Sequence, residues 1–87
     1  MWLKPTGRPP SQLPTGDWAM HMLSQNNPVV VRVTPEALQD VGPPSALSPS
    51  IYKYRNELEE IADRKFMRHE FEPDGTITIK SADVKYA

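Results

Sequence analysis

The chain has 87 residues, 38% of them hydrophobic, which is enough for one small domain with a limited core. Ten Lys plus Arg residues stand against 11 Asp plus Glu, giving a formal net charge of −1. This balance argues against a general nucleic-acid or membrane-surface binder, since both usually carry a basic excess. Cysteine is absent, which excludes disulfide frameworks, thiolate nucleophiles and cysteine-based metal sites.

Residues 1–16 form a proline-rich segment in which Trp2, Leu3 and Leu13 are the sizeable apolar side chains. Proline lacks a backbone donor and favours extended conformations, so we predict a flexible arm that builds no core. The alternative is an arm that binds a partner, although no two prolines have the P-x-x-P spacing that proline-recognition domains read.

The start of the chain contains no apolar run of the length found in secretory signals. The longest aliphatic run is Val29–Val31, far short of the roughly 20 residues that span a bilayer. We therefore expect a cytoplasmic protein with no membrane partner.

A β-hairpin is predicted over residues 17–33. Trp18–Leu23 is apolar enough for a strand, residues 24–28 are turn formers, and Val29–Val33 is rich in the β-branched residues that strands prefer. The first strand has an alternative as a short helix capped by Asp17, because Trp18 and Met22 stand four residues apart. We favour the strand, since the valine strand otherwise lacks a neighbouring partner.

Two helices are predicted next. Thr34 is a suitable N-cap and Pro35 suits the first helical position, while Gly42 and the prolines after it end this helix after about two turns. From Ile51 onward, apolar residues recur at spacings of three and four, which predicts a long amphipathic helix of about five turns. This stripe comprises Ile51, Tyr54, Leu58, Ile61, Ala62 and Phe66.

A second hairpin is predicted at the end of the chain. Glu72–Gly75 has the residues of a tight turn, and residues 76–80 alternate so that Ile77 and Ile79 face inward. The strand before the turn would cover residues 68–71. The resulting fold class is α+β, with one domain over residues 17–87 and an antiparallel sheet covered on one face by the long helix.

The second half of the chain also carries several short motifs, at Thr34–Leu38, Tyr54–Arg55, Leu58–Ala62, Asp74–Gly75 and Ser81–Asp83. Together they resemble a family of small bacterial proteins catalogued as domain of unknown function 1488, over roughly residues 28–84. The resemblance implies a bacterial origin and a compact α+β domain. It supplies no activity, cofactor or catalytic residue, and residues 1–16 have no counterpart in the family's pattern.

The sequence identifies no catalytic, cofactor-binding or metal-binding residue. His21 and His69 lie in no motif with a nucleophile or a metal-ligand spacing, because His69-Glu70 is not followed by the second histidine of H-E-x-x-H. An acidic run on the long helix is interpreted as a solvated face. This run comprises Glu57, Glu59, Glu60 and Asp63.

Two sets of residues are candidates for binding. Trp18, Met20 and Met22 are large and adaptable, so they suit a protein interface if they face away from the core, and otherwise they fill it. The basic cluster Arg64, Lys65 and Arg68, beside Phe66 and His69, would suit single-stranded nucleic acid.

The function predicted from these residues is that of a non-catalytic protein-interaction module, whose partner is another protein or a second copy of the chain. A single-stranded nucleic-acid-binding domain is the first alternative. An enzyme without a recognisable motif is the second, and fold class alone does not choose among the three.

Overall fold

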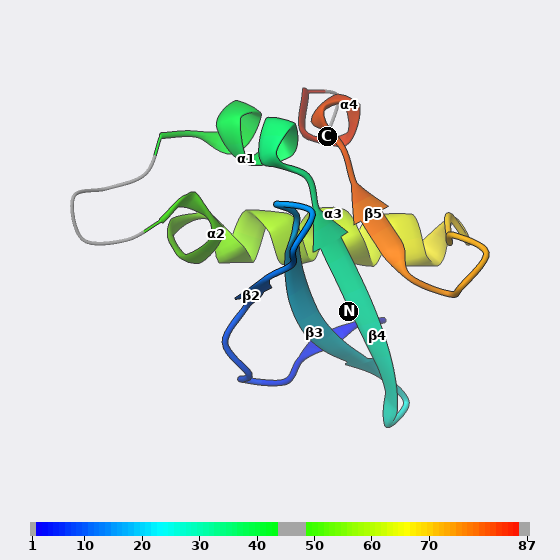
Figure 1. The fold of residues 1–87 in the computed structure, drawn as a ribbon. Helices are drawn as coiled ribbons and strands as arrows, with labels where there is room; N and C mark the ends of the chain where they lie inside the picture. The colour runs from blue at the N-terminus through cyan, green and yellow to red at the C-terminus, as the bar shows by residue number, and fades with distance from the viewer. Residues whose placement is uncertain (1, 44–48, 86–87) are drawn as a thin grey trace.

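The fold is shown in Figure 1 as a computed structural model that describes residues 2–43 and 49–85. In these two ranges the strands are β1 (Lys4–Pro5), β2 (Ser11–Gln12), β3 (Trp18–Ser24), β4 (Asn27–Val33) and β5 (Ile77–Ile79). The helices are α1 (Pro35–Val41), α2 (Ser50–Lys53), α3 (Arg55–Met67) and α4 (Ser81–Lys85). The strands form one sheet in the order β1-β3-β4-β5, with β2 also paired to β3, so the α+β class is confirmed.

The hairpin of β3 and β4 is the centre of the sheet. Its strands pair antiparallel from Trp18↔Val33 to Ser24↔Asn27. The turn consists of Gln25 and Asn26, whose φ angles of 49° and 69° are those of the two-residue turns that match the twist of a hairpin. The hairpin prediction is confirmed and the helical alternative for its first strand is wrong. The turn is shorter than predicted because Pro28, opposite Leu23, already belongs to β4.

The prediction of a purely antiparallel sheet is wrong, because β5 pairs parallel with β4 through Val31↔Ile77 and Val33↔Ile79. Between β4 and β5 the chain crosses over through α1, α2 and α3, and such a crossover is what parallel strands require. The predicted second hairpin is also wrong. The chain leaves α3 through His69 in a left-handed conformation (φ 58°), which interrupts the extended backbone that a strand over residues 68–71 would need.

Helix α1 begins and ends where the sequence predicts, between the N-cap Thr34 and Gly42. Thr34 is its N-cap, and the Thr34 hydroxyl accepts a hydrogen bond from the Ala37 N–H at 3.2 Å. The predicted long helix, in contrast, is two helices that meet at Tyr54 (φ −110°, ψ 25°). The Tyr54 ring packs so close to Gly42 that a Cβ added there would lie 2.5 Å from it. The helix therefore breaks at Tyr54, whose side chain packs against Gly42 at the end of α1.

The hydrophobic core lies between the sheet and α3, which crosses behind the strands in Figure 1. The strands contribute alternate residues, as expected for a sheet with one covered face. The fully buried large side chains are Leu3, Met20, Met22, Ile51, Leu58, Ile77, Ile79, Val31 and Val33. None of the helices within residues 2–43 and 49–85 combines the length and the apolar character needed to cross a bilayer.

The N-terminal segment differs most from its prediction. β1 pairs with β3 through Lys4↔Leu23, β2 pairs with β3 through Gln12↔Trp18, and Leu3 belongs to the core. The expectation that this segment builds no core is therefore corrected. Proline lacks an N–H but keeps its carbonyl acceptor, so a proline-rich segment can still lie along the edge of a sheet.

Candidate functional site

Residues 2–12, called here the N-terminal strap, are held between β3 and α3 by polar contacts. One carboxylate oxygen of Asp63 on α3 accepts hydrogen bonds from the N–H groups of Trp2 and Leu3, at 2.7 and 2.8 Å. An ionised carboxylate accepts stronger hydrogen bonds than a neutral group does, so this double contact ties the start of the strap to the helix.

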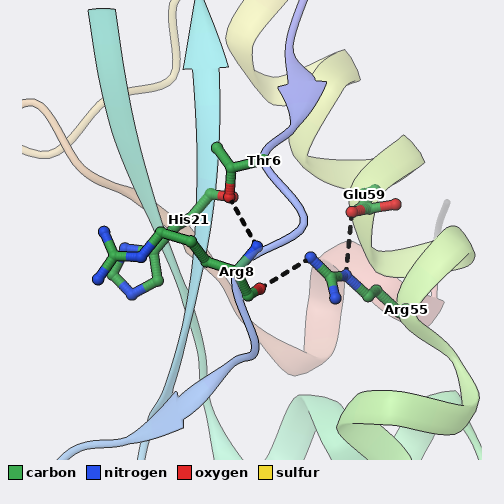
Figure 2. Close-up of polar contacts among 5 residues, drawn as sticks. All are labelled: Thr6, Arg8, His21, Arg55 and Glu59. Carbon is green, nitrogen blue, oxygen red and sulfur yellow. Dashed lines mark hydrogen bonds and ion pairs between the residues drawn. The ribbon is translucent and has the colours of Figure 1, made fainter.

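Figure 2 shows how the middle of the strap is fixed. The Thr6 hydroxyl donates to the carbonyl of His21 at 2.9 Å and accepts from the Arg8 N–H at 3.2 Å. From the other side, the Arg55 guanidinium donates to the Arg8 carbonyl at 3.1 Å and pairs with Glu59 at 3.2 Å. The strap is thus bonded to the edge of the sheet and to α3 at once.

These contacts close one edge of the sheet. β1 and β2 lie along the two ends of β3, and Thr6 bonds to β3 between them. At the opposite edge, β5 is three residues long. Beside it the Thr76 carbonyl accepts from the Glu72 N–H at 2.8 Å, and the Lys80 N–H donates to Asp83 at 2.8 Å. The strap covers one edge and the strand at the other edge is short, and both features protect a sheet against the addition of a further strand.

A cluster of aromatic and sulfur side chains, all of them exposed except the half-buried Phe66, lies at the carboxyl end of α3. Its members, called here the Trp2 patch, are Trp2, Phe66, Met67, His69 and Phe71. Trp2 is 59% exposed, Met67 53% and Phe71 41%. Side chains of four members, all except Phe71, line a cavity of about 240 Å³. The Phe66 and Phe71 rings meet edge to face, with centroids 5.4 Å apart, a favourable aromatic geometry.

Three separate segments build the Trp2 patch. The Trp2 N–H donates to Asp63, which holds Trp2 at the helix, and α3 itself supplies Phe66 and Met67. After α3 the chain reverses, with the Glu70 N–H donating to the Lys65 carbonyl at 3.0 Å. This reversal brings Phe71 back over Phe66.

The predicted basic cluster borders the Trp2 patch, but its members differ. Lys65 is mostly buried and pairs with Asp83 at 3.0 Å and with Glu70 at 3.8 Å. Arg68 is 71% exposed and lies 4.0 Å from Glu70, while Arg64 is exposed. Carboxylates of the chain therefore neutralise Lys65 and leave the two arginines facing solvent.

The predicted interface residues on β3 lie elsewhere. Met20 and Met22 are each 1% exposed, so they fill the core, which is the alternative that the sequence left open, and they are not available as interface residues. Trp18 is half-buried, and its ring meets that of Tyr52 edge to face at 6.2 Å. The alternation of β3 that points Met20 inward points His21 to the opposite face, where it is half-buried.

Of the four acidic residues on α3, Glu57 and Glu60 are exposed as predicted, whereas Glu59 is buried, which corrects its assignment to a solvated face. Glu59 pairs with Arg55, and Asp63 binds the strap. Within the described residues, no group of three His, Asp or Glu side chains is arranged to hold a metal ion. In the turn before β5, the Thr76 hydroxyl and N–H donate to the Asp74 carboxylate at 2.7 and 3.0 Å, and these bonds lower the pKa of Asp74.

Comparison of the chain with models of protein families, with characterised proteins and with solved structures found no match. The resemblance to domain of unknown function 1488 therefore stays a prediction, as do the bacterial origin and the cytoplasmic location.

Sequence reasoning did not identify the Trp2 patch as a site. Phe66 is predicted on the apolar stripe of the long helix and, with His69, beside the basic cluster. Trp2 is predicted to lie in a flexible arm, and Phe71 in a strand over residues 68–71. The available signal was a tryptophan in a segment otherwise poor in large apolar residues, which suggests that the segment contacts something.

Proposed function

We propose that this chain is a non-catalytic protein-interaction module that binds its partner through the Trp2 patch. The observation that carries the proposal is the convergence of Trp2, Met67 and Phe71, all large, apolar and exposed, on one surface. Exposed apolar side chains that gather in one place are typical of interaction sites, whereas scattered ones are not. Tryptophan in particular is enriched among the residues that dominate binding energy.

The size of the cavity supports a protein partner over a small molecule. Its volume of about 240 Å³ is below the ~300–1,000 Å³ typical of small-molecule and cofactor sites. A cavity of this size suits one large side chain that projects from a partner's surface. The exposed rings and Met67 around it then supply the flat apolar contact that surrounds such an anchor.

The two edges of the sheet offer little to a further strand. Pairing of β3 with a strand from a second copy would have to displace the strap, and β5 has only three residues with which to pair. Contact through the Trp2 patch needs no such rearrangement. The partner is therefore a folded surface or helix that docks on the patch, not a strand added to the sheet.

Single-stranded nucleic acid is the second candidate, because Arg64 and Arg68 stand beside aromatic rings, as in proteins that stack bases and bind phosphates. The acidic residues that follow α3 weigh against it. Glu70 lies near Arg68, and Glu72 and Asp74 follow in the next turn, where they would repel a phosphate backbone that continues past the two arginines. A partner with negative charge only beside the arginines need not approach these carboxylates.

Capture from a lysate of the source cells tests the proposal. The baits are the full chain, a Met67→Asp variant and an Asn56→Asp control, which adds the same charge to an exposed position of α3 about 16 Å away along the helix. We expect nuclease-resistant capture of a protein by the wild type and by Asn56→Asp, and its loss with Met67→Asp. Capture that survives Met67→Asp would contradict the proposal, and capture removed by nuclease would favour nucleic acid.

A further inference from the structure

We infer that the segment recognised by the Trp2 patch is an amphipathic helix that carries one large apolar anchor and two carboxylates one helical turn apart. This inference rests on the proposed function and names the partner's chemistry. It comes from the charges that border the patch and from their spacing on α3.

The two exposed arginines form a row along one side of the Trp2 patch. Arg64 and Arg68 are four residues apart, so they are neighbours on the surface of α3, about 6 Å apart along the helix axis. Met67 follows Arg64 by three residues and therefore lies next to this row, between it and the cavity. An apolar hollow and a row of positive charge thus run side by side.

Within the described part of the chain, the charges of these arginines are less well paired than the charge of Lys65 between them, which has two carboxylate partners. No ion pair of Arg64 is found there, and Arg68 has only a contact of 4.0 Å to Glu70, whose carboxylate also faces Lys65. The dipole of α3 favours cations at its carboxyl end, but it supplies neither arginine with a carboxylate to pair with. A carboxylate-bearing partner would supply the missing compensation.

The geometry of the row sets the partner's spacing. Carboxylates at positions i and i+4 of a helix have the same rise as Arg64 and Arg68, so an aligned or antiparallel helix can pair with both. Its apolar anchor would enter the cavity lined by Trp2, Phe66, Met67 and His69. An amphipathic helix on an apolar groove is a recurring mode of recognition, and here the charges determine which helix fits.

The probes that test this inference are two synthetic helical peptides with the same single tryptophan anchor. One carries glutamates and the other lysines at the two flanking positions. Isothermal titration against the full chain should show that the acidic peptide binds at least ~10-fold more tightly than the basic one. Arg64→Glu should weaken binding of the acidic peptide by about threefold to tenfold. Lys53→Glu, an exposed reversal on α2 with the same change in net charge, should leave it unchanged.

The outcomes separate this inference from the proposed function. If both peptides bind equally and Met67→Asp abolishes both, the patch binds proteins but the acidic chemistry is wrong. Tighter binding of the basic peptide, or no binding of either, also overturns the acidic partner, and lysate capture then judges the patch by itself. A 12-nucleotide single strand that outcompetes the acidic peptide would assign the arginine row to nucleic acid. Dimerisation in sedimentation that Met67→Asp abolishes would assign the patch to a second copy.

Discussion

The Leu3 side chain is fully buried although it is near the start of a proline-rich segment, and its truncation tests whether the strap belongs to the domain. Replacing a buried leucine by alanine costs about 2–5 kcal/mol of the free energy of unfolding. The strap can detach locally and leave no rigid cavity, because its first residues are held mainly by Asp63 and by a two-residue pairing with β3. We therefore expect Leu3→Ala to lower the free energy of unfolding by ~2 kcal/mol, at the low end of this range.

Urea unfolding followed by far-ultraviolet circular dichroism measures this loss. A loss of ~2 kcal/mol corresponds to a fall in Tm of about 8–16 °C for a domain of this size. The matched control is Lys4→Ala, the exposed neighbour in β1, which should change the free energy of unfolding by less than ~0.5 kcal/mol. If Leu3→Ala is no more destabilising than Lys4→Ala, the strap does not pack into the core in solution and the reasoning is refuted.

Other substitutions test the backbone, the strap and the turn before β5. Gly42→Ala should lower the free energy of unfolding by about 1–3 kcal/mol more than Gly7→Ala does. Both glycines have positive φ angles, but only at Gly42 would the added methyl group meet a tyrosine ring, at 2.5 Å. Equal losses of stability in thermal unfolding would contradict this. Asp63→Ala should speed hydrogen exchange of the Trp2 and Leu3 amides, because the Asp63 carboxylate accepts their hydrogen bonds. Unchanged exchange rates would show that these amides are protected by another contact. The hydrogen bonds from Thr76 depress the folded-state pKa of Asp74, so their stabilisation is present above the ordinary aspartate range and is lost as pH falls through the lowered pKa. A carboxyl NMR titration should place the Asp74 midpoint below that range, and Asp74→Asn should remove this acid dependence.

The parts of the fold that sequence predicted well are those fixed by neighbouring residues. Thr34 and Pro35 determine where α1 begins through one capping bond and one backbone angle. The valines of β4 favour a strand, and the β3–β4 hairpin joins segments adjacent in the chain. Each of these needs only local chemistry.

The errors arise where a distant contact overrides local preference. Proline content predicted a flexible arm, but Leu3 and Trp2 bond to Asp63, 60 and 61 residues further along the chain. Alternation predicted a hairpin at Ile77–Ile79, but the direction of β5 is set by the crossover through the helices. The apolar spacing from Ile51 onward gave no sign that the helix would break at Tyr54.

The candidate site could not be predicted from the sequence for the same reason. The charges of Arg64, Lys65 and Arg68 were visible in the sequence, but their different partners were not, since Asp83 comes from α4. The Trp2 patch depends on three segments that meet only after folding. The exposure of a residue depends on which other residues cover it in the fold, and composition does not predict those contacts.

The most direct test of the central claim is hydrogen exchange of the full chain, measured alone and with the protein that it captures. The account predicts increased protection at residues 2–5 and 64–71, which contain the Trp2 patch and the strap residues beside it. Residues 27–33 of the central hairpin and residues 77–79 of β5 should keep their rates. Protection confined to the hairpin or to β5, with the Trp2 patch unchanged, would contradict the account.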